Sequence, residues 1–466
     1  MLRTKIIATL GPATDAPGVL SALVDAGMDV ARLNASHSSR EDLQRRFSAV
    51  RSAAHTAGRH IAVMLDLGGP KLRVGEMAPG SLLVAGSEFS LVAGVCVGDA
   101  SQACINYSRL AEDLSVEDRL LLDDGAIQLR VSRVLPDFVN TVVEVGGLLG
   151  SHKGVNVPGV RLNVESITPG DKADLQWGLE AGVDMVAQSF VRTSQDVRRL
   201  RELMGPHVVP IVAKIEKHEA VEELGAIIFA ADAVMVARGD LGVETSPEDV
   251  PVIQRRIVEA CHRTGTPVII ATQMLESMTS ALRPTRAEAS DVANAVFDGV
   301  DALMLSGETA VGAHPLKTLE TMVRIAGTAG QHADANSWPL PDSDTADDVT
   351  GAVSSAVCEL AAKLGVSAIV TATQSGATAR AVAARRPSVP VLAATPDPAV
   401  ARQLELLWGV TPAVVSWPDT TDEMLRLAVR AARDAGLASP GDLVAVTAGV
   451  SVNTPGSTDL IQVRRA

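Results

Sequence analysis

The chain has 466 residues, a length that predicts two or three domains. Hydrophobic residues make up 47% and charged residues 21%, a balance typical of a globular protein with buried cores. The net charge of −14 argues against a general nucleic-acid-binding protein, because such a protein needs a basic face.

Eight short apolar runs end in polar or glycine-containing tails. In chain order they cover 4–12, 29–37, 61–67, 184–191, 209–216, 232–240, 267–275 and 301–309. Near-continuous apolar strands are typical of a parallel sheet buried on both faces. Helical patterns separate most runs, and one begins with Pro315, an expected first-turn residue. Eight consecutive β-then-α units predict an α/β protein built on a (β/α)8 TIM barrel, with a doubly wound sheet as the alternative.

A segment of short alternating strands interrupts this rhythm after the third run. Residues 70–157 contain many turn signals, and the DDG sequence at 123–125 lies between two alternating segments, which predicts a hairpin. We expect these residues to form an inserted β-barrel-like lid domain over the carboxyl ends of the barrel strands. The catalytic barrel is then assigned to residues 1–69 and 158–335.

A stretch rich in Pro, Asp and Ser follows the barrel and is predicted to be a linker. Beyond it, apolar strand patterns at 366–373, 389–395 and 441–449 alternate with helical segments such as 422–436. Residues 345–466 are therefore expected to form a C-terminal α/β domain.

The sequence also predicts a compartment. It shows no charged-then-apolar signal pattern and no apolar run of spanning length, so we expect a cytoplasmic protein without membrane or nucleic-acid partners. The four cysteines form neither a CxxC pair nor a metal-like spacing; they are Cys96, Cys104, Cys261 and Cys358. We expect all four to be small buried residues in a reducing compartment.

Polar residues gather where the barrel runs end. Residues two apart in a strand point the same way, so shared faces are predicted for Arg32, Asn34 and Ser36, for Lys214 and Glu216, for Arg238 and Asp240, and for Ser306 and Glu308. Three more polar residues close runs of their own: Asp66, Ser189 and Thr272. A salt bridge or a strand-end cap explains any one pair, but surface charge would not choose the same end of every strand. We therefore expect an active site at the carboxyl face of the barrel.

These residue types indicate a specific chemistry. Glu216 and Asp240 are carboxylates from neighbouring strands, and Mg²⁺ typically takes one or two carboxylates plus substrate phosphate. Lys214 can offset charge on a phosphoryl group or an enolate oxygen, and Arg32 supplies a fork for phosphate. The residues predict a Mg²⁺ site that handles a phosphorylated carboxylic acid, and they leave open whether the enzyme is a lyase or a transferase.

At these residues the sequence resembles the pyruvate kinase family. The stretches that carry the resemblance are TKIIATLGPA, GMDVARLNASH, SHKGVNVPG, AKIEKHEA, VMVARGDLGVE, ATQMLESM, PTRAEASDVANAVFDG and MLSGETAVG, in this order over nearly the whole chain. The resemblance implies a homotetramer of barrel, lid and C-terminal regulatory domain. It also implies transfer of the phosphoryl group of phosphoenolpyruvate to ADP, giving ATP and pyruvate in glycolysis, with Mg²⁺ or Mn²⁺ as cofactor.

The resemblance further implies roles for the matched residues. Those expected to act in catalysis are Lys214, Arg32, Thr272, Ser306 and Glu308. Those expected to bind substrate are Arg32, Lys214, Gly239, Asp240 and Thr272, and those expected to meet the nucleotide are Asn34, His37, Arg73 and Lys153. The Mg²⁺ ligands are Glu216 and Asp240, and the family's K⁺ ligands match Asn34, Ser36, Asp66 and Leu67. Whether Thr272 delivers the proton itself, or through water with Ser306 and Glu308, is left open.

One stretch departs from most familiar members of the family. Their motif after the third strand reads Asp-Thr-Lys-Gly-Pro-Glu, with a Thr three residues later, whereas residues 66–71 here read Asp-Leu-Gly-Gly-Pro-Lys and the later residue is Val74. The tethered ammonium of Lys71 can stand where K⁺ would offset the anionic groups of the substrate. Lys-bearing members of the family are K⁺-independent, so we expect that K⁺ is not required. A solvent-facing hinge lysine is the alternative.

A second small-molecule site is implied in the C-terminal domain. The stretch TATQSGATAR at 371–380 is a strand followed by small hydroxyl residues and a helix start, and the family places an effector-phosphate loop here. The residues expected to hold a sugar phosphate or nucleotide monophosphate are Thr373, Ser375, Gly376 and Thr378. A plain helix cap is the alternative.

Two other classes of protein fit part of the pattern. One is a barrel lyase or aldolase that makes the enolate of pyruvate with Mg²⁺, but such an enzyme would not need Lys153 or a lid. The other is a catalytically silent sensor that uses only the C-terminal domain. A silent sensor would be expected to have lost Lys214, Glu216 or Asp240, but all three are present.

Overall fold

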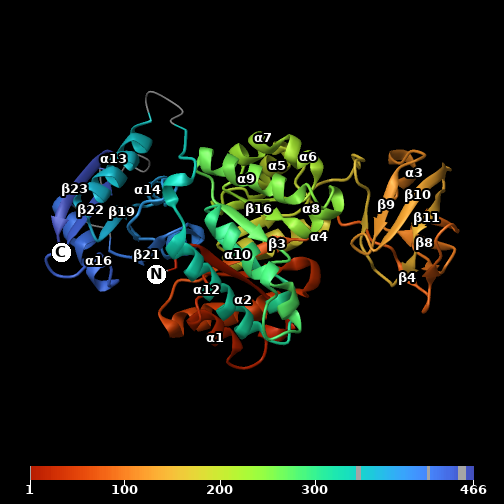
Figure 1. The fold of residues 1–466 in the computed structure, drawn as a ribbon, viewed down its shortest axis with the longest axis horizontal. Helices are drawn as coiled ribbons and strands as arrows, with labels where there is room; N and C mark the ends of the chain where they lie inside the picture. Colours follow the sequence, from red (N-terminus) through yellow and green to blue (C-terminus); the bar gives the residue numbers. More distant parts are fainter. Residues whose placement is uncertain (1, 343–347, 417–419, 450–457) are drawn as a thin grey trace.

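The computed structural model describes residues 2–342, 348–416, 420–449 and 458–466. A barrel occupies the middle of the molecule, with a β-rich domain at one end and the C-terminal domain at the other (Figure 1). The barrel closes in the strand order β1-β18-β17-β16-β15-β14-β3-β2. Its strands are β1 (Lys5–Leu10), β2 (Val30–Asn34), β3 (Ala62–Leu67), β14 (Met185–Gln188), β15 (Ile211–Ile215), β16 (Ala233–Ala237), β17 (Val268–Ala271) and β18 (Ala302–Leu305).

The barrel strands are apolar along their length because both faces are covered. Every residue of β1 and of β3 is buried. One face packs inside the barrel, where Ile7, Met64 and Met235 share a cluster, and the other packs beneath the surrounding helices. Since β1 pairs with both β2 and β18, the sheet closes, which confirms the predicted (β/α)8 barrel over the doubly wound alternative.

The helices around the barrel begin at residues that satisfy free backbone amides. Thr168 with Asp171 and Thr285 with Glu288 form capping boxes, and Pro315 lies in the first turn of its helix as the sequence predicted. The helices are α1 (Val19–Asp25), α2 (Arg40–Ala57), α4 (Pro169–Ala181), α5 (Ser194–Met204), α6 (His218–Glu222), α7 (Leu224–Ala230), α8 (Arg238–Glu244), α9 (Val250–Thr264), α10 (Arg286–Phe297), α11 (Gly307–Ala310) and α12 (Pro315–His332).

Two strands end earlier than the sequence predicted. β16 stops at Ala237 and α8 starts at Arg238, while β18 stops at Leu305 and α11 starts at Gly307. The expectation that Arg238 with Asp240 and Ser306 with Glu308 share strand faces was therefore wrong. In a helical turn, residues two apart are rotated by about 200° and point to different sides.

The inserted domain is a curled sheet in the order β13-β9-β10-β11-β6-β8, with its own apolar core around Phe89 and Leu129. Asp123, Asp124 and Gly125 all have positive φ and join β9 to β10, where Leu122 pairs with Ile127, so the predicted hairpin is confirmed. The elements are β4 (Glu76–Met77), β5 (Leu82–Leu83), β6 (Glu88–Ala93), β7 (Val97–Gly98), β8 (Gln102–Ile105), α3 (Leu110–Asp113), β9 (Arg119–Leu122), β10 (Ile127–Val134), β11 (Phe138–Val145), β12 (Gly147–Leu148) and β13 (Val155–Asn156).

A disulfide joins Cys96 to Cys104 in this domain, with Cα atoms 5.5 Å apart. The expectation of reduced thiols was therefore wrong for these two; Cys104 is buried as expected, whereas Cys96 is only partly buried. A tight turn between β7 and β8, in which the amide of Asp99 donates to the carbonyl of Gln102 at 2.9 Å, folds the chain back and brings the two side chains together. Cys261 is free and buried, and Cys358 is free and half-buried.

The C-terminal domain is a five-stranded sheet in the order β21-β20-β19-β22-β23, flanked by helices. Three strands coincide with the predicted patterns, but β21 and the antiparallel edge strand β23 were missed. The elements are α13 (Val349–Leu364), β19 (Ala368–Ala372), α14 (Ala377–Ala383), β20 (Val391–Thr395), α15 (Pro398–Gln403), β21 (Val410–Val414), α16 (Thr421–Asp434), β22 (Leu443–Ala448) and β23 (Leu460–Arg465). Throughout the described ranges, no helix combines the length and the apolar character needed to cross a membrane.

Part of the predicted linker packs firmly against both neighbours. Trp338 is 7% exposed, its indole N–H donates to the carbonyl of Phe297 at 2.6 Å, and its ring meets that of Trp408 edge-on at 5.8 Å. Residues 343–347 of the same segment lie outside the described residues. The covalent connection thus also serves as packing between the barrel and the C-terminal domain.

The C-terminal domain closes the amino-terminal end of the barrel. Leu406 is 4% exposed and belongs to the same apolar cluster as the barrel's interior residues. Three ion pairs connect the C-terminal domain to the beginnings of barrel strands: Arg386 to Asp301 at 2.7 Å, Arg402 to Asp184 at 2.7 Å, and Glu405 to Lys5 at 3.1 Å. The opposite, carboxyl end of the barrel faces the inserted domain.

Candidate active site

The carboxylate of Asp66 lies at the centre of the polar cluster at the carboxyl end of the barrel. It is 1% exposed, its Oδ2 accepts from Nε of Arg32 at 2.7 Å, and its Oδ1 lies 3.3 Å from Nζ of Lys214. Burial alone would raise the pKa of Asp66, but the charges of Lys214 and then Arg32 outweigh burial and lower this pKa. Asp66 is therefore ionised at neutral pH and bridges two cations from β2 and β15.

Lys214 has three oxygen partners. Its Nζ donates to Oγ of Ser189 at 2.7 Å and lies 2.8 Å from Oε1 of Glu216, in addition to the contact with Asp66. Burial would lower the pKa of Lys214, yet Asp66 and Glu216 more than compensate and raise it. Arg32 is held in a similar way, because its Nη1 also donates to Oγ1 of Thr9 at 3.0 Å. Both cations remain charged although they are nearly buried.

Two carboxylates of this cluster repel one another. Glu216 is 1% exposed, and its Oε2 accepts from the amide of Phe190 at 2.8 Å. Burial is the main cause that raises the pKa of Glu216; the attraction of Lys214 opposes the shift and the repulsion of Asp240 adds to it. A divalent cation would relieve that repulsion, so Glu216 and Asp240 fit a Mg²⁺ site completed by substrate. In the part of the chain that the structure describes, no group of three or more metal-ligating His, Cys, Asp or Glu exists.

Gly239, Asp240 and Thr272 are brought together as the sequence predicted. Gly239 and Asp240 lie in the first turn of α8, and the amide of Gly239 donates to Oγ1 of Thr272 at 2.8 Å. Thr272 follows β17 with a φ of 65°, and Gln273 has a φ of 54°. Both are non-glycine residues in the left-handed region, which is sparsely populated outside turns and functional sites.

Glu308 supports the loop after β17 through a backbone hydrogen bond. It is fully buried, its Oε2 accepts from the amide of Ser306 at 2.6 Å, and its Oε1 accepts from the amide of Leu275 at 3.2 Å. Oγ of Ser306 is buried and has no hydrogen-bond partner among the described residues. That hydroxyl can therefore donate to or accept from a bound molecule or water.

The residues after β2 and β3 form a compact corner of the site. Oδ1 of Asn34 accepts from the amide of Ser36 at 3.1 Å and caps a single helical turn that ends at His37. The two segments approach closely there, because a Cβ at Gly68 would lie 2.9 Å from Oγ of Ser36. Partial loss of solvent, followed by the charges of Arg73, Lys71 and Arg32, lowers the pKa of His37. Leu67, the last residue of β3, is 2% exposed.

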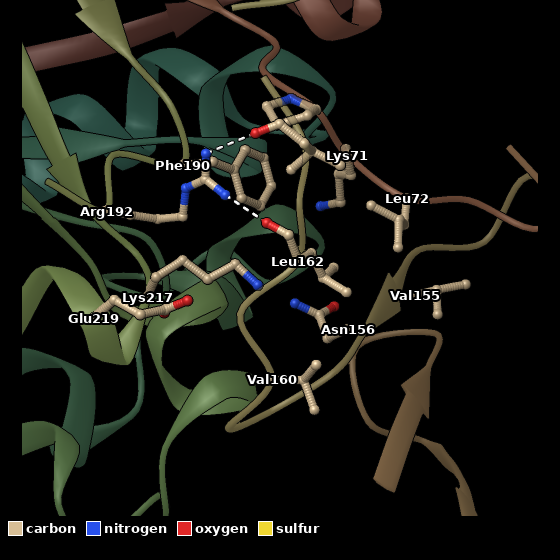
Figure 2. Close-up of a pocket in the computed structure, with 12 residues that line it drawn as sticks. Lys71, Leu72, Val155, Asn156, Val160, Leu162, Phe190, Arg192, Lys217 and Glu219 are labelled. Atoms are coloured by element: carbon tan, nitrogen blue, oxygen red, sulfur yellow. Dashed lines mark hydrogen bonds between the residues drawn. The ribbon is translucent and has the colours of Figure 1, made fainter. Parts of the chain in front are cut away.

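Lys71 lies where the chain leaves the barrel for the inserted domain. Its Nζ is 3.5 Å from Oδ1 of Asp240. Figure 2 shows Lys71 on the wall of a cavity of about 30 Å³, with Phe190 and Lys217 on the barrel side and Asn156 on the other. Lys71 is thus paired with Asp240, a predicted Mg²⁺ ligand.

The other two predicted nucleotide residues make their contacts within the inserted domain. Nη1 of Arg73 donates to the carbonyl of His152 at 3.0 Å, and Nζ of Lys153 lies 2.8 Å from Oδ1 of Asp123. They lie on the two chain segments that connect this domain to the barrel.

Sequence reasoning missed a second contact between the inserted segment and the barrel. Nδ2 of Asn156, in β13, donates to Oε1 of Glu244 at 2.8 Å, and Nζ of Lys217 lies 2.5 Å from the same oxygen. Glu244 is 5% exposed and ends the helix that begins with Arg238. No strand-end pattern marks Glu244, because its position depends on the length of α8.

The predicted effector residues surround the start of α14. Oγ1 of Thr373 accepts from the amide of Gly376 at 2.9 Å, and the hydroxyl of Thr378 lies 2.7 Å from that of Thr458. Ser375 is exposed. Thr373 therefore closes the turn that precedes the helix, an arrangement compatible with the plain cap as well as with a phosphate loop.

Comparison with known proteins identifies the family. The model of the pyruvate kinase barrel domain matches residues 1–319, and the model of the pyruvate kinase α/β domain matches residues 351–464. The chain belongs to the pyruvate kinase family. Members of this family are phosphotransferases, and they generally need a divalent metal.

Full-length relatives in the pyruvate kinase family agree with the domain matches. The pyruvate kinase of Geobacillus stearothermophilus is 46% identical over 471 residues, which cover 99% of this chain and 80% of that protein. The pyruvate kinase of Clostridium acetobutylicum is 41% identical over 470 residues, covering 100% of this chain and 99% of that protein. The pyruvate kinase of Mycobacterium tuberculosis is 43% identical over 466 residues, covering 99% and 98%.

The raised pKa of Glu216 predicts a stability cost that Glu216→Gln removes. Because the folded-state pKa lies above the ordinary value of 4.5, the folded state binds the proton more tightly, and this residue's contribution to stability falls as pH rises above about 4.5. We expect the melting temperature of Glu216→Gln relative to the unmodified protein, measured with a chelator, to increase from pH 4.5 to 8.

Glu288→Gln is the matched control of opposite sign. Burial raises the pKa of Glu288, but hydrogen bonds from Ser277 and Thr285 outweigh burial and lower this pKa. Its stabilising contribution is lost in acid and fully present above about pH 4.5, so Glu288→Gln should become relatively less stable as pH rises toward 4.5 and should change little from pH 4.5 to 8. Parallel pH trends of the two variants would contradict the assignment of Glu216 as a charge that the fold disfavours.

Proposed function

We propose that this chain is a pyruvate kinase that transfers the phosphoryl group of phosphoenolpyruvate to ADP, giving ATP and pyruvate in glycolysis, with Mg²⁺ or Mn²⁺ and without a need for K⁺. The observation that carries the proposal is the buried cluster of Asp66, Lys214 and Glu216 beside Asp240, in a chain that matches the family over both domains. The family match also disfavours the lyase and silent-sensor alternatives.

In the proposed reaction, Arg32 and Lys214 bind the phosphoryl group of phosphoenolpyruvate, because Asp66 holds both cations at the mouth of the barrel. The backbone amides in the first turn of α8 and the hydroxyl of Thr272 orient the substrate carboxylate. Glu216 and Asp240 would hold the divalent cation, whose charge stabilises the negative charge that develops on the phosphoryl and enolate oxygens. His37, Arg73 and Lys153, with Asn34, are proposed to meet the nucleotide.

The bond changes divide into two steps. The bond between phosphorus and the enol oxygen breaks, and a bond forms between phosphorus and a terminal oxygen of ADP, leaving the enolate of pyruvate. The methylene carbon of the enolate then takes a proton. We place Thr272 on that face, with Ser306 and Glu308 behind it, because Glu308 accepts from the amide of Leu275 in the loop after β17 and from the amide of Ser306 after β18.

Assays of pyruvate formation with and without ADP test the proposal, and Lys214→Met tests its chemistry. A positive charge about 4 Å from developing negative charge supplies about 4 kcal/mol at an effective dielectric constant near 20. We therefore expect Lys214→Met to lower the turnover number roughly a thousandfold while Mg²⁺ still binds.

Lys363→Met is the control for this substitution, because Lys363 is a surface residue of α13 whose side chain is 80% exposed; its turnover should be unchanged. Pyruvate formation independent of ADP would instead indicate a lyase. Near-normal turnover of Lys214→Met would show that Lys214 is only an ion-pair partner.

The K⁺ independence is proposed from Lys71. Its ammonium lies 3.5 Å from Asp240, close enough to offset negative charge where substrate and divalent cation would meet. We expect full activity with Mg²⁺ in buffer free of Na⁺ and K⁺, with a bulky organic counter-cation. We expect Lys71→Glu to make activity depend on added K⁺, because the charge beside Asp240 is reversed.

Lys172→Glu is the matched charge reversal at a surface position of α4, where the lysine side chain is 43% exposed, and it should create no K⁺ dependence. Strong stimulation of the unmodified protein by K⁺ would contradict the proposal and return Lys71 to the role of a hinge lysine.

We also propose that a phosphorylated effector binds the loop of Thr373, Ser375, Gly376 and Thr378, in a cytoplasmic homotetramer such as the family resemblance implies. The proposal is supported by the exposed hydroxyl of Ser375 at the start of α14. We expect at least one sugar phosphate or nucleoside monophosphate in a panel to shift both the activation curve and the melting temperature. A panel that shifts neither would leave the loop as a helix cap only.

A further inference from the structure

Arg238 opens α8, but its side chain turns away from the carboxylates of the site. The side chain is 10% exposed, and its Nη1 lies 2.8 and 2.7 Å from the two oxygens of Asp291 in α10. The proposed reaction assigns no role to this residue. A nearly buried guanidinium beside a reaction centre nevertheless requires a full set of partners.

The remaining donors of Arg238 hold the loop after β17. Nη2 donates to the carbonyl of Thr272 at 2.8 Å and to the carbonyl of Gln273 at 3.0 Å, and Nε lies 3.2 Å from the carbonyl of Thr272. Two consecutive peptide groups are thus fixed by one side chain. Asp291, on its other side, fixes the guanidinium itself.

These two peptide groups are the ones with unfavourable backbone geometry. Thr272 has a φ of 65° and Gln273 a φ of 54°, and a β-branched residue is rarely found in the left-handed region. Such conformations are energetically unfavourable and persist only where surrounding contacts impose them. The contacts here come from Arg238, while the amide of the next residue, Gly239, donates to Oγ1 of Thr272.

We propose that Arg238 is a positioning residue that holds Thr272 in the left-handed conformation and so aims its hydroxyl at the substrate. This inference rests on the proposed function. Two consecutive residues at the start of α8 then fix the orientation of Thr272. Arg238 donates to its carbonyl, and the amide of Gly239 donates to its hydroxyl oxygen. The step that depends on this aim is delivery of a proton to the methylene carbon of the enolate, rather than binding of ADP.

Lysine cannot replace arginine in this role. The guanidinium presents five N–H donors in a planar fork, so it can serve a carboxylate and two carbonyls at once. An ammonium on a flexible stem keeps the charge but not the geometry. Arg238→Lys therefore separates the charge of the residue from its positioning of the loop.

The experiment compares the unmodified protein with Arg238→Lys, Asp291→Asn and the surface control Arg255→Lys. Arg255 is a partner of Glu259 on α9, and its side chain is 73% exposed. The measurements are turnover with phosphoenolpyruvate and ADP, KM for ADP, melting temperature, and the rate at which the enzyme exchanges the methyl hydrogens of pyruvate with D2O. The exchange reports on proton transfer at carbon without phosphoryl transfer from phosphoenolpyruvate.

We expect Arg238→Lys to lower turnover and hydrogen exchange by about a hundredfold each, the effect of misplacing a reacting group by about 1 Å. KM for ADP should stay within about twofold. Asp291→Asn keeps the arginine donors on the loop and should lower both rates less. Arg255→Lys should match the unmodified protein.

Different results distinguish failure of the proposed function from failure of this inference. No turnover of the unmodified protein would overturn the proposed function. Normal turnover of the unmodified protein, with exchange and turnover of Arg238→Lys within about threefold of it, would overturn this inference alone. A lowered melting temperature with unchanged exchange in both Arg238→Lys and Asp291→Asn would show a merely structural role and would also overturn it. Should Arg238→Lys fail to fold, the exchange rate of Asp291→Asn decides between these outcomes.

Discussion

The buried carboxylate of Asp66 is the interaction on which the carboxyl end of the barrel depends. It lets Arg32 and Lys214 remain charged out of water, a situation that costs several kcal/mol for an unpaired ion. Those two cations are balanced by Asp66 and Glu216, and Asp240 is balanced by Lys71, whose ammonium lies 3.5 Å away. The cluster therefore has no surplus positive charge to offer an anionic phosphate substrate, and binding of the substrate together with a divalent cation would supply it.

The sequence was most informative where the geometry of a closed barrel leaves little choice. Eight apolar runs predicted eight strands, and parallel strands that close into a barrel must bring their carboxyl ends to one ring. Asp66, Lys214 and Glu216 could therefore be grouped from sequence alone, although they lie far apart in the chain. The hairpin at 123–125 was predictable for a different reason, because its turn chemistry is local.

The sequence was least informative where a long-range contact sets the local backbone. Nothing in the run that ends at Thr272 indicates a positive φ, since Arg238, the residue that holds its carbonyl, lies 34 positions earlier. The early end of β16 was likewise not predictable from its own sequence pattern. The pairing of Cys96 with Cys104 depends on a turn that no cysteine spacing reveals, and the packing of Trp338 depends on a domain interface that was expected to be an open linker.

Leu406 gives the barrel interior a residue that belongs to another domain. The three barrel strands that begin at the ion pairs around it are β1, β14 and β18, through Lys5, Asp184 and Asp301. At their other ends, the same strands carry or lead into hydroxyl residues of the site. Thr9 contacts Arg32, and Ser189 contacts Lys214. The amide of Ser306 donates to Glu308. These strands therefore connect the ion pairs of the C-terminal domain to the hydroxyl groups at the far rim of the barrel through the interior of the molecule.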